Sequence, residues 1–138
     1  MPSNALLAAL LLAANTVVAD TWQMETFEYM DDQKIVVYVS ESDIAANPEW
    51  QPEEGAPPLT IGRLLEIVRI STATDPRLGE ARISEIKLKQ ISHHEKQHRW
   101  YYLVKLKSGN GGRNAWHYIA VLLNGKVVQA IAEPLPIK

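Results

Sequence analysis

The chain has 138 residues, no cysteine and a formal net charge of −2 at pH 7. That length fits a single domain and excludes a (β/α)8 barrel, which needs about 250 residues. Without cysteine the chain forms no disulfide bond, offers no thiolate to a metal ion and has no thiol nucleophile.

Residues 1–19 have the pattern of a signal peptide. An apolar run of ten residues, ALLAALLLAA, spans residues 5–14, and small residues at Val17 and Ala19 precede Asp20 as they do at a cleavage site. The run is too short to cross a bilayer, which needs about 20 apolar residues. Because no Lys or Arg precedes it, either the leader is atypical or the true start lies upstream; a buried N-terminal helix is the alternative. We expect cleavage after Ala19, a periplasmic or secreted product, and no stable membrane span in that product.

Charge is distributed unevenly along the rest of the chain. Residues 20–54 hold ten acidic residues and one basic residue, a sum of −9, whereas residues 55–138 hold six acidic and thirteen basic residues, a sum of +7. Either the acidic segment lies against the basic part and neutralises it, or the basic surface attracts an anionic partner.

The acidic segment, residues 20–56, is predicted to contain one strand and a proline-rich loop. The β-branched run at residues 35–39 is typical of a strand, and residues 22–29 fit either a second strand or a short helix. Residues 41–60 hold four prolines and one glycine, so we expect no regular element there, with Trp50 anchoring the loop to the domain.

Thr60 is expected to cap a helix, because apolar residues follow it at positions i, i+3, i+4 and i+7. The helix should end near residues 71–74, since a proline at position 76 disfavours helical backbone in the residue before it. The predicted buried stripe consists of Ile61, Leu64, Leu65 and Val68.

Beyond the helix the apolar period changes to two, which predicts strands. Asn124-Gly125 is typical of a hairpin with a type I′ turn. The strands are expected around residues 86–88 and at residues 100–107, 115–123 and 127–132.

These elements predict an α+β fold in which one helix packs on a roughly four-stranded antiparallel sheet, in two layers. The helix and sheet would make up a domain of residues 57–138, preceded by the acidic segment.

Three segments resemble PepSY-like and cystatin-like exported domains. These are the helix start at residues 58–60 (PLT) and the strand sequences at residues 100–104 (WYYLV) and 121–128 (VLLNGKVV). The resemblance implies a helix clasped by an antiparallel sheet and a role in binding peptides or proteins or in modulating proteases. It implies no catalytic residues, because these families share none. The usual PepSY ending has an Asp-x-x-Gly turn where this chain has Asn124-Gly125.

A basic face is predicted on the sheet, because alternate side chains of a strand point to opposite sides. The side chains expected to face the helix are Ile86, Leu88, Trp100, Tyr102 and Val104. The opposite, outward face would carry the candidate ligand-binding residues Lys87, Lys89, Tyr101, Lys105 and Lys107. This face is either a solvated surface or a site for an anionic cell-envelope ligand, a peptide or an exported protein.

Three of the four histidines fall close together, at His93, His94 and His98. Imidazole nitrogens with a nearby carboxylate suit zinc, copper or nickel. However, Lys96 and Arg99 repel a cation, and the alternative is a solvated hairpin loop. The chain contains no HExxH sequence, which excludes that class of metalloprotease.

The favoured function is that of an exported, non-enzymatic binding or accessory module for a peptide, a protein or an anionic ligand. We expect no cofactor and no nucleic-acid partner. One alternative is a periplasmic metal-binding protein that uses the three histidines, and another is a small enzyme whose site is not identified.

Overall fold

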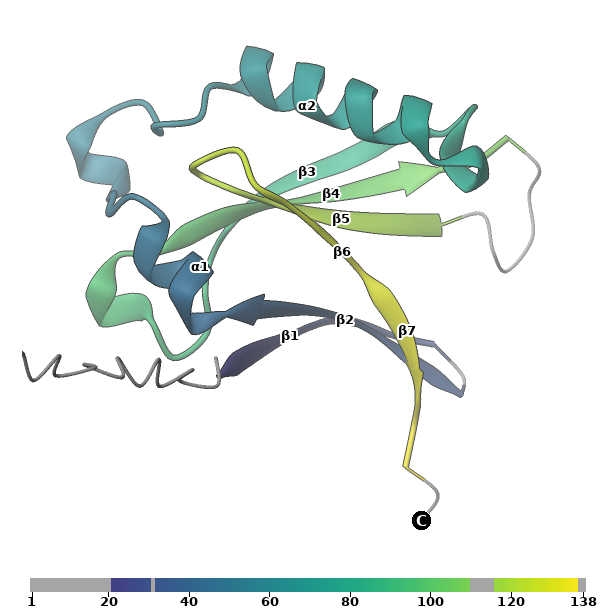
Figure 1. The fold of residues 1–138 in the computed structure, drawn as a ribbon, viewed down its shortest axis with the longest axis horizontal. Helices are drawn as coiled ribbons and strands as arrows, with labels where there is room; N and C mark the ends of the chain where they lie inside the picture. The colour runs from purple at the N-terminus through teal and green to yellow at the C-terminus, as the bar shows by residue number, and fades with distance from the viewer. Residues whose placement is uncertain (1–20, 31, 110–115, 137–138) are drawn as a thin grey trace, which may run out of the picture.

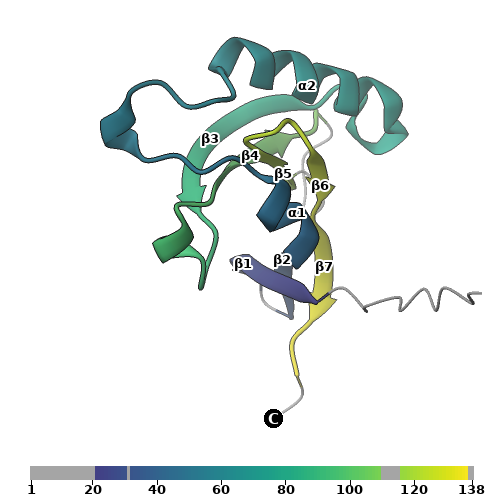
Figure 2. The same ribbon diagram turned by 60° about the vertical axis from the view of Figure 1, so that its left-hand side comes forward.

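The computed structural model describes residues 21–30, 32–109 and 116–136, so the predicted leader lies outside the described residues. In Figure 1 the long helix α2 lies over one face of a curved antiparallel sheet, and a second sheet lies against the opposite face. Figure 2, turned by 60°, shows the same order of layers.

The second sheet begins with a hairpin of β1 (Trp22–Met30) and β2 (Gln33–Ser40). The strand predicted at residues 35–39 is therefore confirmed, and residues 22–29 form a strand rather than a helix. β2 also pairs with β7 (Ile131–Pro134) near the C-terminus, which gives three strands in the order β1-β2-β7.

A short helix, α1 (Glu41–Ala46), follows β2 directly. Ser40 caps it, because the Ser40 hydroxyl accepts a hydrogen bond of 3.1 Å from the backbone N–H of Asp43. The expectation that residues 41–60 hold no regular element is thus wrong, since every proline of that segment comes after the helix has ended.

The rest of this segment is a loop with a single 3-10 turn, η1 (Pro52–Glu54). Trp50 is buried, as predicted, and its ring meets that of Trp100 edge to face at 5.5 Å. The loop is therefore anchored to the domain by an aromatic contact.

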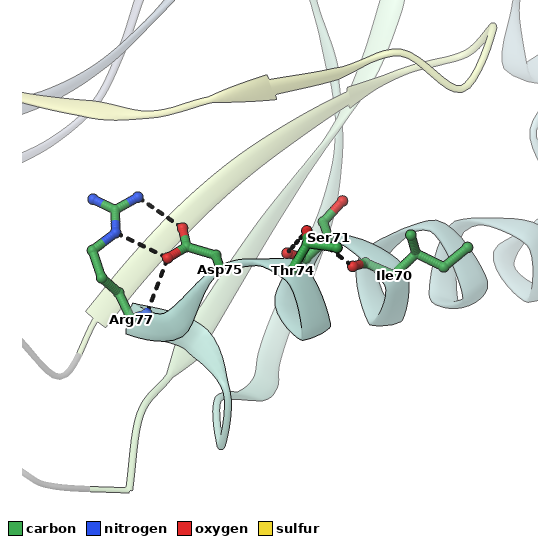
Figure 3. Close-up of polar contacts among 5 residues, drawn as sticks. All are labelled: Ile70, Ser71, Thr74, Asp75 and Arg77. Atoms are coloured by element: carbon green, nitrogen blue, oxygen red, sulfur yellow. Dashed lines mark hydrogen bonds and ion pairs between the residues drawn. The ribbon is translucent and has the colours of Figure 1, made fainter.

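The predicted long helix is α2 (Ile61–Thr74), and Thr60 caps it by accepting from the backbone N–H of Arg63 at 3.2 Å. At the other end, shown in Figure 3, the hydroxyl of Thr74 donates to backbone carbonyls of the last turn. Asp75 then accepts three hydrogen bonds from Arg77, which fixes the turn η2 (Pro76–Leu78).

The buried side of α2 differs from the predicted stripe. Leu64, Ile67 and Val68 are buried, whereas Ile61 and Leu65 are 51% and 43% exposed. Leu64 and Val68 belong to both the predicted and the observed buried stripe. The helix is rotated about its axis relative to the prediction, so that Ile67 faces the sheet in place of Ile61 and Leu65.

The larger sheet follows α2 and has the order β3-β4-β5-β6, with every pair antiparallel. A 3-10 turn, η3 (Glu95–Gln97), lies between its first two strands. The strands are β3 (Arg82–Gln90), β4 (Trp100–Lys107), β5 (Trp116–Leu122) and β6 (Val127–Gln129).

The hairpin predicted at Asn124-Gly125 joins β5 to β6, but its turn is not of type I′. That type needs positive φ at two consecutive residues, and in this turn Gly125 alone has it, at 91°. The backbone N–H of Gly125 donates to the carbonyl of Leu122, and that of Leu122 donates to the carbonyl of Lys126. The loop therefore has three residues, 123–125.

The chain passes from one sheet to the other between β6 and β7. Ala130 separates the two short strands, of which β6 pairs with β5 and β7 pairs with β2. In Figure 1 this segment runs downwards in yellow from the upper sheet to the lower one.

The predicted fold class, one helix on a single sheet in two layers, is therefore wrong. The structure is mostly strands, with two antiparallel sheets of three and four strands and one long helix. The prediction failed because the second sheet joins the N-terminal hairpin to the C-terminal strand, and such a distant pairing leaves no local signal in the sequence.

Two hydrophobic clusters hold the layers together. One lies between α2 and the four-stranded sheet and includes Trp50, Leu64, Tyr102 and Val104. The other lies between the sheets and consists of Val37, Val39, Ile44, Ile91, Tyr101, Leu103, Ala120 and Leu122. The acidic segment thus shares a core with residues 57–138.

Candidate functional site

The faces of the four-stranded sheet divide as the period-two pattern predicts. The side chains expected to face the helix pack in the cluster beneath α2: Ile86, Leu88, Trp100, Tyr102 and Val104. The lysines of β3 and β4 consequently lie on the opposite face, which is turned to the second sheet.

The second sheet covers one end of this face. Tyr101 is 1% exposed, and its hydroxyl donates a hydrogen bond of 3.3 Å to the carboxylate of Glu25 on β1. The same carboxylate accepts from the backbone N–H and the hydroxyl of Ser92, at 2.6 and 3.0 Å. Burial, followed by the charge of Glu25 and this hydrogen bond, raises the pKa of Tyr101 far above its ordinary value. The expectation that Tyr101 faces solvent is wrong, because the acidic segment folds over it.

At the other end of the face, strand pairing arranges the side chains in rows, in which Lys107 is exposed and Lys105 and Tyr118 are half-buried. Lys107 lies between Arg82 on β3 and Trp116 on β5, and the next row places Lys105 between Glu85 and Tyr118. Trp116 is 36% exposed. We call four of these residues the lysine–aromatic patch: Lys105, Lys107, Trp116 and Tyr118.

Cation–π contacts hold the patch together. The ammonium nitrogen of Lys105 lies 4.3 Å from the centroid of the Trp116 ring and 5.6 Å from that of Tyr118. The ammonium nitrogen of Lys107 lies 5.2 Å from the Trp116 centroid. An ammonium group is attracted to the negative face of an aromatic ring, so the rings orient both positive charges. The arrangement suits an anionic ligand, because two cations are positioned before it binds.

The five predicted ligand residues are thus divided by the fold. Lys105 and Lys107 belong to the lysine–aromatic patch. Lys87 is exposed on β3, where its ammonium nitrogen lies 3.4 Å from the carboxylate of Glu85. Lys89 is half-buried beside the covered Tyr101. Only the part of the predicted site near the end of β4 is brought together on an accessible surface.

Trp116 and Tyr118 are the patch residues that the sequence reasoning missed. Both alternate with period two on β5, and the antiparallel register places them opposite Lys107 and Lys105. A hairpin register between the two strands would have revealed the four residues as one group. That register was not apparent, because residues 108–115 between the strands contain several overlapping turn signals, Asn110-Gly111 among them, and these do not specify one loop length.

The three histidines do not form a metal site in the part of the chain that the structure describes, where no group of three potential ligands occurs. His94 is buried, with Nδ1 2.9 Å from the carbonyl oxygen of Ser92 and Nε2 2.9 Å from the carboxylate of Glu41. His93 and His98 have positive φ angles of 64° and 54°. Because both ring nitrogens of His94 have hydrogen-bond partners, His94 connects this loop to α1 and is not available as a metal ligand.

Several acidic side chains of the N-terminal segment contact basic groups of the remaining chain. Asp43 lies 2.6 Å from Lys126, and Glu49 lies 3.5 Å from Arg99. These pairs lie around α1 and the loop that follows it, away from the end of the sheet that carries the patch. The acidic segment therefore neutralises part of the basic sequence locally.

No helix among the described residues is long and apolar enough to cross a membrane. Comparison of the chain with protein-family models, with curated proteins and with solved structures finds no match. The resemblance to PepSY-like and cystatin-like domains therefore stays a prediction.

Proposed function

We propose that the protein is an exported, non-enzymatic binding module that holds an acidic polypeptide at the lysine–aromatic patch. The observation that supports this most is the placement of the Lys105 and Lys107 ammonium groups over the Trp116 ring. Two oriented cations on neighbouring rows of a sheet are complementary to closely spaced carboxylates.

Two other anionic partners fit the patch less well. A membrane surface is broad and would also meet the acidic N-terminal layer, whose charge from residue 20 to residue 54 is −9, so repulsion would oppose docking. A polysaccharide usually stacks its sugar rings on an open aromatic face, but ammonium groups already lie over the ring of Trp116. A polypeptide chain with acidic side chains needs neither a broad basic plane nor a vacant ring.

The proposal is tested by retention of the purified protein on beads that carry poly-glutamate, at low and at high salt. Wild type should be retained at low salt and released at high salt, because exposed charges are screened over about 8 Å at physiological ionic strength. The double variant Lys105→Gln, Lys107→Gln should lose retention. The matched control is Arg63→Gln, Arg69→Gln, which removes the same charge from exposed positions on α2.

Parallel measurements use vesicles of anionic phospholipid and beads that carry polygalacturonate. The proposal is wrong if wild type and the patch variant are retained equally on poly-glutamate, or if neither is retained at low salt. Retention on the vesicles or on polygalacturonate, but not on poly-glutamate, would contradict the choice of partner.

A further inference from the structure

β3 is an edge strand with an accessible outer side. Among the described residues it pairs with β4 alone, through eight of its nine residues. Arg82, Ile83, Ser84, Glu85 and Lys87 are exposed. Alternate residues of an edge strand turn their backbone N–H and C=O groups away from the one neighbouring strand, so another extended chain can pair there.

The two sides of β3 differ in chemistry. On the side of the patch, β3 carries Arg82, Glu85, Lys87 and Lys89, which have the Cα partners Lys107, Lys105, Leu103 and Tyr101 on β4. On the side of α2, it carries Ile83, Ile86 and Leu88, of which Ile83 is exposed and the other two are half-buried. The basic side adjoins the patch, since Arg82 and Lys107 are directly paired.

We infer that the acidic polypeptide binds as an added strand along the outer edge of β3, with acidic side chains alternating with apolar ones. The inference rests on the proposed function and specifies how the partner is bound. Side chains of an added strand alternate between the two sides of the sheet. One set would meet Lys87 and Lys89, with Glu85 as the one acidic residue on that side of β3. The other set would extend the apolar surface of Ile86 and Leu88.

The β-bulge at Ser84 sets where pairing can occur. The register between β3 and β4 shifts between Ile83 and Glu85. A bulge disturbs regular pairing locally, so the uninterrupted stretch available to a partner is residues 85–90. A peptide of about six to eight residues is long enough to cover it, at about 3.3 Å per residue.

The test uses a fluorescently labelled eight-residue peptide in which glutamate alternates with valine, and anisotropy measures its binding to the full protein. A matched peptide has proline in place of one central valine, which removes a backbone donor needed for strand pairing but keeps every charge. We expect the first peptide to bind and the proline peptide to bind at least tenfold more weakly. Equal binding of the two peptides would overturn strand addition.

A protein variant tests the charged side of the added strand. Lys87→Glu replaces an exposed cation on β3 by an anion, and we expect it to weaken binding of the glutamate–valine peptide about tenfold, because an attraction becomes a repulsion. Lys96→Glu, in the exposed turn η3, makes the same charge change away from this edge and should leave binding unchanged. Equal weakening by both variants would contradict the location.

Hydrogen exchange locates the pairing directly. On saturation with the glutamate–valine peptide, amides within residues 85–90 should exchange more slowly, while those of α2 should not change. If the peptide fails to bind but poly-glutamate still retains the protein through Lys105 and Lys107, strand addition is wrong and the proposed function stands. If both fail, both are wrong.

Discussion

The ammonium nitrogen of Lys105 lies 4.3 Å from the centroid of the Trp116 ring, across the register of β4 and β5. This contact joins residues eleven positions apart in the sequence and explains how a half-buried lysine is oriented on the sheet. Because a ring attracts a cation without neutralising its charge, the contact orients the ammonium group and leaves it positive.

Removing the ring should weaken ligand binding without unfolding the protein. Trp116→Ala is expected to lower the affinity for poly-glutamate about two- to fivefold, since an exposed cation–π contact contributes about 0.5–1 kcal/mol. Trp22→Ala removes an exposed tryptophan from β1 and should leave the affinity unchanged. The affinities are measured by titration calorimetry, and equal losses in both variants would contradict the role of Trp116.

The rotation of α2 is tested by two neighbouring leucines. Leu64→Ala should destabilise the protein by about 2–5 kcal/mol, the range for truncating a buried leucine, because Leu64 is fully buried. Leu65→Ala should cost less than about 1 kcal/mol, because Leu65 is 43% exposed. Urea unfolding measures both, and a larger loss for Leu65→Ala would show that the helix presents its other side to the sheet.

Asn47 connects three separate segments and should be sensitive to substitution. Its buried side chain donates to the carbonyl of Trp100 at 2.7 Å and accepts from the backbone N–H of Asn124 at 3.1 Å. Asn47→Ala removes the partner of both part-buried backbone groups, and we expect a total loss of about 1–3 kcal/mol. Glu53→Ala, at an exposed position of the same loop, is the control and should change the urea midpoint little.

His94 makes stability depend on pH. Burial lowers its pKa, but hydrogen bonds to the Ser92 carbonyl and to Glu41, with the charges of Glu41 and Glu95, outweigh burial and raise the pKa above its ordinary value. A raised pKa in the folded state means that the charged form stabilises folding fully below about pH 6.5, and that this contribution is lost as pH rises through the folded-state pKa.

The stability lost on His94→Gln should therefore be larger at about pH 6 than at about pH 8.5. Urea unfolding at the two pH values measures it. Gln97→Ala, at an exposed position of the same loop that carries no titratable group, should show no such difference. A loss that is the same at both pH values, or larger at the higher one, would mean that the Glu41 contact does not favour the charged imidazole.

Short sequence patterns predicted the helices and turns that are determined by residues close together in the chain. Thr60 and the apolar residues after it specify the start of α2, and Asn124-Gly125 specifies the hairpin between β5 and β6. By contrast, α1 was not predicted, because six residues are too few to show a helical period and the prolines that follow it favour irregular structure.

The candidate site was only half predictable for a related reason. Period two placed Lys105 and Lys107 on one face with Tyr101, but it cannot say which part of that face another layer covers. The second sheet covers Tyr101 because β2 pairs with β7 and because Glu25 accepts a hydrogen bond from Tyr101. Both contacts join residues that are far apart in the sequence. Such contacts are set by the packing of the whole chain.

Backbone and indole amide chemical shifts of the wild-type protein, recorded while an acidic peptide is added, test the central claim most directly. The account predicts that the largest changes fall on the Trp116 indole N–H, on the amides of Lys105 and Lys107 and on those of residues 85–90, and that they diminish with added salt. Changes centred on α2 or on β1, or no changes at any peptide concentration, would contradict the assignment of the lysine–aromatic patch as the binding site.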